Sequence, residues 1–243
     1  YKMNAVLKRK VLYVQAQFES PVNVSSGENE VTDSDVLRDC NGTPFITGSS
    51  LAGAMRAYIE KEKSEPCLLG YSDGDAGKMS SLFISDLTFE ENPVIGVRDG
   101  VSLSDKKTAV TQSKYDIEIL EAGVKAHFYL ELVIRENDDE MMMDQELATI
   151  LCGINAGEIR LGAKKTRGFG EFKIVRLSEK VYSKENYLEY ADSYNPEKWE
   201  NCNNELESWI KKASWSPKVI HVDVPLRMKG GISIRRYAAK KGE

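Results

Sequence analysis

The chain has 243 residues, and its mix of 41% hydrophobic and 29% charged residues excludes collagen-like, low-complexity and disordered proteins. Its longest apolar stretches are far shorter than the roughly 18 residues of a membrane-spanning helix, and no apolar signal core follows the first residues. We therefore expect a globular protein of the cytoplasm with no membrane partner. Four cysteines without a CxxC pair predict free thiols, not a zinc site or a disulfide framework.

The net charge of −5 argues against a nucleic-acid partner, but the charges are unevenly distributed along the chain. Residues 158–180 contain seven Lys and Arg against three acids, and residues 225–243 contain six against one. Residues 136–146, in contrast, contain six acids and no base. Because a phosphate chain responds to the local field within a Debye length of about 8 Å, these basic stretches keep RNA binding possible.

Taken in chain order, the hydrophobic pattern predicts strands at residues 11–18, 81–89, 124–135 and 170–177, and helices at 50–63 and 144–154. Ser49 or Ser50 is expected to cap the first helix. Residues 91–123 are polar and contain two extended arms, which predicts a protruding hairpin. The resulting order is that of an α+β, ferredoxin-like βαββαβ core, enlarged by the hairpin.

Residues 1–183 are expected to form this domain, with the hairpin insertion at about 91–123. The composition of residues 184–218 predicts an acidic, partly helical extension or linker, and its tryptophans are available for packing. Residues 219–224 (VIHVDV) predict a terminal strand, which a basic tail follows. Proline and glycine come after this strand as they do after the first one, so residues 219–243 could open a second copy of the domain.

The most informative segment is the glycine-rich loop, residues 161–172 (LGAKKTRGFGEF), between a predicted helix and a predicted strand. Glycine lets the backbone approach a phosphate closely and adopt positive φ, while cations neutralise the phosphate. The pattern is not a Walker loop, because the lysines precede the central glycine and a strand follows. Read alone, it also fits an ordinary basic turn. The candidate RNA-binding residues are Gly162, Lys164, Lys165, Thr166, Arg167, Gly168, Phe169 and Gly170.

The string GAKKTRGFG closely resembles the glycine-rich loop of the RAMP superfamily of CRISPR proteins. Three more segments resemble that family in the same order. They are residues 41–59 (NGTPFITGSSLAGAMRAYI), with Thr47 where proline is usual, residues 81–87 (SLFISDL), and residues 98–116, whose ends are similar to the arms of the family's thumb hairpin. The first loop and the thumb are most similar to the repeating backbone subunit of type III effector complexes.

The resemblance implies a fold like that of RNA-recognition motifs, which assembles along a CRISPR guide RNA with other RAMP subunits or domains. It also implies that a loop aspartate cuts the complementary target RNA. Residues 32–39 (TDSDVLRD) align with the family's catalytic string, so Asp33 is the candidate, and Asp35, where the family has proline, is a weaker one. A polar loop with carboxylates suits Mg²⁺ or another divalent cation, with Asp33 as its ligand. A turn aspartate bonded to its own backbone is the alternative for Asp33.

Other candidates also have structural interpretations. By resemblance Ser49 and Ser50, at the start of the first helix, and Arg56, within it, are also RNA-binding candidates. Arg56 would reach a guide phosphate, but it could equally form a surface ion pair. Phe169 could stack on a base, although a core position is favoured.

Three functions remain open, in decreasing order of support. The first is a guide-binding backbone subunit that cleaves target RNA, and the second is a catalytically inactive guide scaffold. The third is a ribonuclease that processes precursor CRISPR RNA. It is disfavoured because the two histidines available as a general base, His127 and His221, both lie in predicted strands.

Overall fold

The computed structural model describes residues 4–25, 34–62, 67–72, 77–103, 109–200, 202–220, 222 and 224–231. Two residues singled out in the sequence, Asp33 and His221, lie outside them. The elements in chain order are β1 (Val6–Phe18), β2 (Phe45–Ile46), α1 (Gly48–Glu62), β3 (Leu82–Ile84), β4 (Leu87–Phe89), β5 (Ile95–Leu103), β6 (Ala109–Leu120), β7 (Lys125–Arg135), α2 (Glu140–Asn155), the 3-10 turn η2 (Lys165–Arg167), β8 (Phe172–Tyr182), η3 (Tyr187–Asp192), η4 (Pro196–Lys198) and α3 (Leu206–Ile210).

The main sheet has the strand order β2-β4-β7-β1-β8, and β3 also pairs with β7. Its pairs are antiparallel, with Leu12 opposite Leu130 on β7 and opposite Glu179 on β8. The strand that begins the chain therefore lies between the third and the last core strands, as in a ferredoxin-like fold. The predicted α+β, ferredoxin-like class is confirmed.

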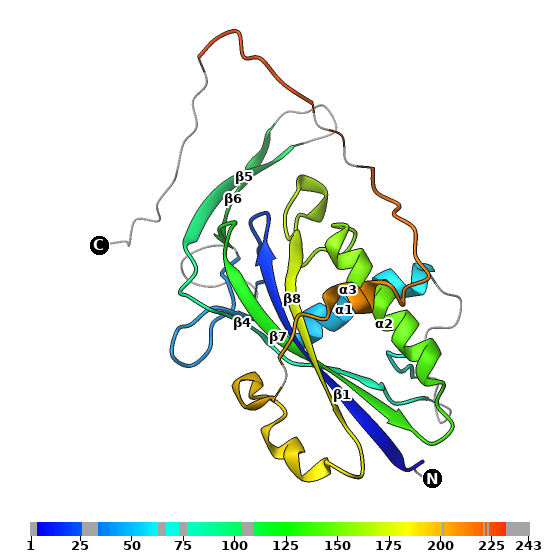
Figure 1. The fold of residues 1–243 in the computed structure, drawn as a ribbon. Helices are drawn as coiled ribbons and strands as arrows, with labels where there is room; N and C mark the ends of the chain where they lie inside the picture. The colour runs from blue at the N-terminus through cyan, green and yellow to red at the C-terminus, as the bar shows by residue number, and fades with distance from the viewer. Residues whose placement is uncertain are drawn as a thin grey trace.

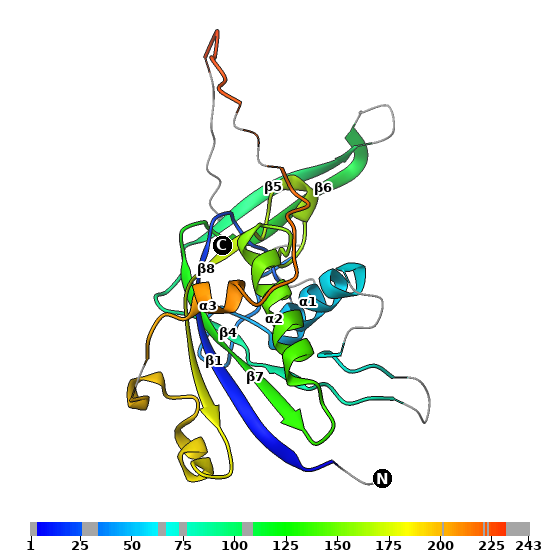
Figure 2. The same ribbon diagram turned by 45° about the vertical axis from the view of Figure 1, so that its right-hand side comes forward.

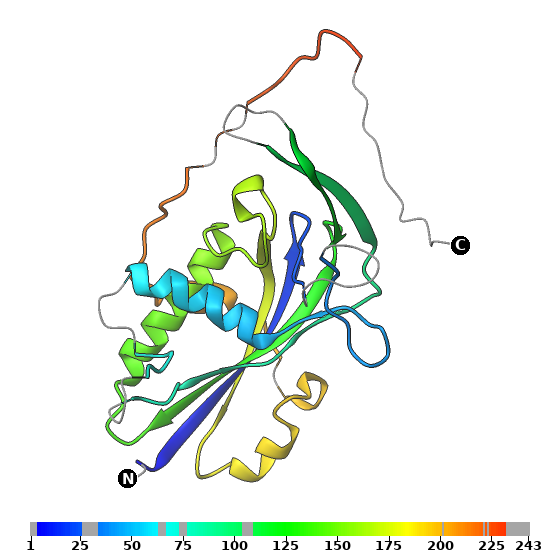
Figure 3. The ribbon, with the colours of Figure 1, turned by 180° about the vertical axis from the view of Figure 1, so that it is seen from behind.

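The helices α1, α2 and α3 cover one face of this sheet (Figures 1 and 3). Alternate residues of β1, such as Leu12, Val14 and Phe18, point into this layer and are fully buried against the helices and the neighbouring strands. The helix α2 begins earlier than predicted, because the Asp139 carboxylate accepts the Met142 amide and caps it.

The opposite face of the sheet carries η3 and η4, which lie on the other side from α1 and α2 (Figure 2). Here Glu131 of β7 is 3% exposed and accepts hydrogen bonds from the hydroxyls of Tyr190 (2.8 Å) and Tyr194 (2.7 Å). It also forms an ion pair with Arg9, whose guanidinium lies over the Tyr190 ring. We call Arg9, Glu131, Tyr190 and Tyr194 the inner cluster, and it fixes the predicted acidic extension to the sheet.

The hairpin predicted at residues 91–123 is present as β5 and β6, the thumb hairpin, which projects from the end of the sheet opposite the start of β1 (Figure 1). Its base is anchored to the chain that follows β1, where Val22 pairs with Leu120 and the Asn23 side chain donates to the Glu118 carbonyl (2.7 Å). An ion pair between Arg98 and Glu121 (2.8 Å) joins the two strands at this base.

Two predicted boundaries were wrong because side chains compete for backbone groups. The strand predicted at 81–89 breaks into β3 and β4 at Ser85, whose hydroxyl accepts the Tyr129 amide (2.9 Å). The first helix is capped by Thr47, whose hydroxyl accepts the Ser50 amide (3.3 Å), and not by Ser49 or Ser50.

The terminal strand predicted at 219–224 was also wrong for its described residues, 219, 220, 222 and 224, which form no strand. Ile220, Val222 and Val224 are 86%, 72% and 66% exposed. Alternating apolar residues form a strand only where an edge accepts their backbone, and here the described residues join no sheet, although the Val219 amide donates to the Glu158 carboxylate (3.2 Å). That residues 219–243 open a second domain stays a prediction.

Candidate nucleic-acid interface

The glycine-rich loop leaves α2, turns through η2 and returns into β8. Its base is closed by the Leu161 amide, which donates to the Gly170 carbonyl (2.9 Å). The turn itself needs two left-handed residues, Lys164 at φ 58° and Gly168 at φ 84°. Glycine tolerates this conformation, whereas Lys164 is strained by it, so the loop holds a lysine in a conformation that the free chain rarely adopts.

Two glycines bring this loop against the chain that follows β1. A Cβ at Gly162 would overlap with the Asn23 carbonyl, and one at Gly170 would overlap with the Leu161 carbonyl. The amides of Ala163 and Gly170 donate to the Asn23 and Pro21 carbonyls at 2.9 and 2.8 Å. Since Asn23 also contacts the base of the thumb hairpin, the glycines fix the loop beside that hairpin.

The side chains of Lys165, Thr166 and Arg167 are exposed, and Lys164 is half-buried. Arg167 donates to the Tyr115 hydroxyl on β6 (3.0 Å), and the Lys164 ammonium lies 4.0 Å from the centre of the same ring. Within the described part of the chain, none of the three loop cations is paired with a carboxylate. Lys164, and then Arg167, hold the pKa of the Tyr115 phenol below its usual range.

This arrangement leaves an uncompensated positive surface where the loop meets the thumb hairpin. Charged donors in such a turn bind phosphate oxygens well, because charge-assisted hydrogen bonds are the stronger kind.

The chain from Ser34 to Arg38 is also fixed to the thumb base. Ser34 pairs with Ile117 of β6, and Glu118 accepts both the Val36 amide (3.1 Å) and the Arg38 guanidinium (2.8 Å). Asp35, within this segment, is only 6% exposed. A ligand of a hydrated, phosphate-bound cation needs access to solvent, so this position fits Mg²⁺ poorly.

Asp33 precedes this fixed segment and lies outside the described residues. Among the residues that the structure does describe, no three His, Cys, Asp or Glu side chains are grouped so that they could hold a metal ion.

The structure does not bring the predicted residues of α1 into the basic surface. Arg56 donates to the Leu69 carbonyl (3.2 Å) and lies 3.6 Å from Glu60, one turn along the helix. Ser49 and Ser50 both bond the Thr47 hydroxyl. The Arg56 contacts match the surface ion pair that the sequence also allowed, and the two serines lie in the first turn of the helix that Thr47 caps.

Phe169 and His127 differ in how many contacts their side chains make with the rest of the protein. Phe169 is half-buried and belongs to neither hydrophobic cluster, so the favoured core position was wrong and its ring remains available near the loop. His127 lies in β7, where its Nε2 is 3.0 Å from the Thr88 hydroxyl and its ring packs against Tyr13. It is a strand residue, as the sequence favoured.

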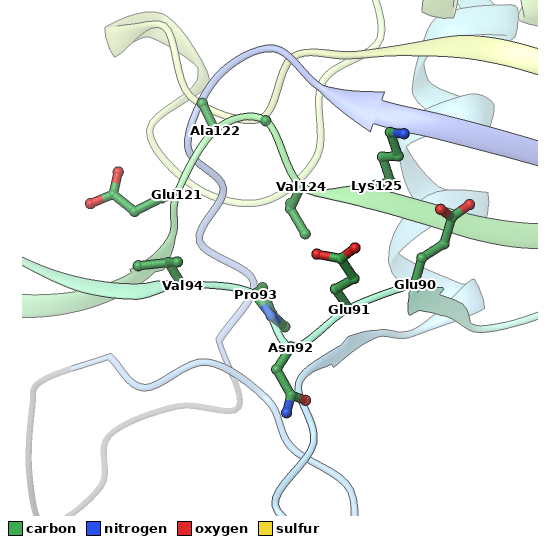
Figure 4. A pocket seen from close by; sticks show the side chains of 10 residues that line it. Glu90, Glu91, Asn92, Pro93, Val94, Glu121, Ala122, Val124 and Lys125 are labelled. Carbon is green, nitrogen blue, oxygen red and sulfur yellow. The ribbon is translucent and has the colours of Figure 1, made fainter.

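A second surface at the thumb base is acidic. A hollow of about 340 Å³ opens between the β4–β5 connection and the β6–β7 turn, and Figure 4 shows the carboxylates of Glu90, Glu91 and Glu121 around it, with Lys125 nearby. Glu121 is paired with Arg98, but Glu90 and Glu91 still make this side of the hairpin less favourable for a phosphate chain than the glycine-rich side.

Comparison with known families decides the identity. The sequence model of the RAMP superfamily matches residues 15–173, from β1 through the glycine-rich loop into β8. The chain belongs to the RAMP superfamily. A comparison with curated protein sequences finds no significant match.

As a RAMP protein, the chain is a CRISPR-associated RNA-binding protein that forms complexes with other Cas proteins. Within the described residues, none of the helices combines the length and the apolar character needed to cross a bilayer. Tyr115 and its neighbour Gly100 were not singled out by sequence reasoning. The thumb resemblance contained them, but no sequence spacing reports a contact between two separate elements.

Proposed function

We propose that this RAMP protein is a guide-RNA-binding backbone subunit of a type III effector complex. The observation that carries the proposal is the set of three cations, Lys164, Lys165 and Arg167, which lies beside the base of the thumb hairpin with no described carboxylate as partner. In such a subunit the loop binds the guide phosphates without reading bases, and the hairpin projects toward the guide–target duplex. Neighbouring RAMP subunits or domains continue the same arrangement along the RNA.

We further propose that the complex cleaves complementary target RNA, with Asp33 as the catalytic residue. Two features support this assignment: residues 32–39 resemble the family's catalytic string, and the following segment, Ser34 to Arg38, is fixed to the thumb base. A divalent cation held by Asp33 would polarise the scissile phosphate. The loop cations orient the RNA backbone, so this chain supplies binding and position as well as the carboxylate.

The binding part is tested by measuring RNA affinity over a salt series. Each single-strand phosphate contact contributes about 0.7 to the slope of log affinity against log salt. Replacing both Lys164 and Lys165 with alanine should weaken binding to every guide sequence and flatten the slope by about 1.4. Lys61→Ala with Lys211→Ala, two exposed lysines in the helical layer, is the matched control. An unchanged slope in the loop variant rules out the loop as the RNA site.

The cleavage part is tested in the assembled complex with guide, complementary target and Mg²⁺, with and without a chelator. Asp33→Ala should keep guide and target affinity but cut at least about a hundredfold more slowly, the loss expected for one positioned catalytic contact. Asp35→Ala is the comparison, and a loss there with none at Asp33 moves the assignment by two residues. If both variants and the double variant cut at the parental rate, the chain is a guide scaffold.

A further inference from the structure

Among the described residues of the thumb hairpin, Tyr115 contacts the cations of the glycine-rich loop. Its hydroxyl accepts a hydrogen bond from Arg167 Nη1 at 3.0 Å, and its ring lies 4.0 Å below the Lys164 ammonium. Two long, flexible side chains are thereby held by one rigid ring. In the inner cluster a carboxylate shares the equivalent contacts, but here no described carboxylate does.

The hairpin is shaped to receive this ring. Gly100 of β5 lies directly opposite Tyr115 of β6, and a Cβ at Gly100 would overlap with Cζ and the hydroxyl of Tyr115. Gly100 is not among the glycines with positive φ, so its backbone is that of an ordinary strand residue. Glycine within a strand weakens that strand. At position 100 glycine is needed because a side chain would collide with the Tyr115 ring, not because the backbone adopts a conformation that only glycine tolerates.

The contacts leave most of the cations' hydrogen-bonding capacity free. A lysine ammonium has three donors and a guanidinium five, and the phenol oxygen accepts only one of the latter. A phosphate can therefore bind the remaining donors while the ring stays in place. Side chains that are already ordered lose less conformational entropy when the phosphate binds.

We infer that Tyr115 is a positioning residue of the RNA site, which presets Lys164 and Arg167 for a phosphate and joins the loop to the thumb hairpin. The inference rests on the proposed binding of RNA by the glycine-rich loop. It assigns to Gly100 a matching role, because only a residue without a side chain leaves room for the ring.

The test is the RNA affinity of variants over the same salt series. Tyr115→Ala should bind single-stranded RNA about tenfold more weakly, equivalent to about 1.4 kcal/mol, because two side chains must then be ordered on binding. The slope against salt should not change, because no charge has been removed. Tyr115→Phe keeps the ring under Lys164 but loses the acceptor of Arg167, so about a threefold loss is expected.

Gly100→Val tests the mechanism with Tyr115 still present. Valine suits a strand, so the hairpin should form, but its side chain displaces the ring and should cause the same tenfold loss. The matched control is Gly96→Val on the same strand, which would displace Glu121 and should leave RNA affinity unchanged. Combining Gly100→Val with Tyr115→Ala should add nothing to Tyr115→Ala alone.

A spectroscopic readout separates positioning from a purely structural role. In protein labelled with 3-fluorotyrosine, the ¹⁹F resonance that is missing from Tyr115→Phe identifies this residue. RNA bound to Lys164 and Arg167 reduces their effect on the phenol, so this resonance should shift on addition of RNA.

Two results would overturn the inference while leaving the proposed function intact: parental or tighter RNA binding by Tyr115→Ala, or a Tyr115 resonance that RNA does not move. The flatter salt slope expected for the double variant of Lys164 and Lys165 is a separate readout. If that variant binds like the parent, the RNA site itself is misplaced and the inference fails with it.

Discussion

Two clusters in this protein join an arginine to a tyrosine, and they do different things. In the inner cluster Arg9 lies over Tyr190, but the buried Glu131 binds both and neutralises the charge. At the loop Arg167 and Lys164 hold Tyr115, and no carboxylate takes part among the described residues. The same residue types therefore form a neutral structural cluster where a carboxylate completes them, and leave unneutralised positive charge, which we propose binds phosphate, where none does.

The pKa values of the two tyrosines reflect this difference. Burial, and then the hydrogen bond to Glu131, raise the pKa of Tyr190 to about 12. The pKa of Tyr115 is lowered by Lys164 and Arg167. One phenol is held neutral in a packed site, and the other is surrounded by unneutralised positive charge.

The largest effect should come from removing the carboxylate of the inner cluster. Glu131→Leu leaves Arg9 without its partner and two phenols without an acceptor, so the free energy of unfolding should fall by about 3–5 kcal/mol. Urea denaturation measures this loss, and RNA affinity of the folded protein should be nearly unchanged. Glu131→Gln, which keeps an acceptor, should lose less. A loss below about 1 kcal/mol would make the inner cluster no more than a surface contact.

The next effect is local to the glycine-rich loop. Gly168 has φ 84° with open space around it, so Gly168→Val should strain the turn by about 1–3 kcal/mol, weaken guide binding and keep the fold. Gly168→Asn is the matched control, because asparagine tolerates this conformation and should bind RNA better than the valine variant. Affinity and thermal melting are measured together. Parental RNA binding by Gly168→Val would show that the turn geometry is not used.

A smaller effect concerns alkaline pH. An unfolded tyrosine titrates near pH 10, whereas Tyr190 in the folded protein titrates at about 12. Between these values the unfolded state releases the proton first, so the stability contributed by Tyr190 is present below about pH 10 and is lost as pH rises to about 12. Urea denaturation across this range should show a shallower decline for Tyr190→Phe than for the parent. Tyr115→Phe should not reproduce that change, since the Tyr115 pKa is displaced in the other direction.

The smallest effect is expected at Arg56, which we still propose as an RNA contact by resemblance. Its partner Glu60 is exposed, so Arg56→Ala should change stability by less than about 0.5 kcal/mol. If Arg56 contacts one phosphate, its removal should reduce the slope of log affinity against log salt by about 0.7. A slope equal to that of the parent would leave Arg56 with its contacts to Glu60 and Leu69 alone.

Much of the fold could be predicted from periodicity. The alternation in β1 and β7 and the helical spacing in α2 indicate elements that the structure contains, because burial on one face imposes those periods. The break at Ser85 could not be predicted, since it depends on a hydroxyl that bonds a residue 44 positions away. The strand at 219–224 failed for the opposite reason: its pattern is favourable, but pairing also requires an available edge.

The candidate site was predictable only in part. The glycines and cations of the loop are adjacent in sequence, so their chemistry can be read directly. The partner Tyr115 is about 50 residues away, and only the close approach of the loop to the thumb base brings it within 3.0 Å of Arg167. Glu131 lies on the side of β7 that carries the extension, and it is buried because the extension covers that side. The alternation within β7 cannot predict this burial.

Because Tyr115 is fixed by its pairing with Gly100, the length of the hairpin beyond this pair can change without altering the contacts of Tyr115 with the loop. Residues added in equal number to both arms on the tip side of this pair leave the register between the pair and Leu120 unchanged, so Tyr115 still faces the loop. Each added pair of residues lengthens an arm by about 7 Å. A single residue inserted between Leu120 and Tyr115 would instead turn the ring to the other face. The reach of the arm can therefore be changed beyond this pair, in relatives or by design, without disturbing the cations at its base.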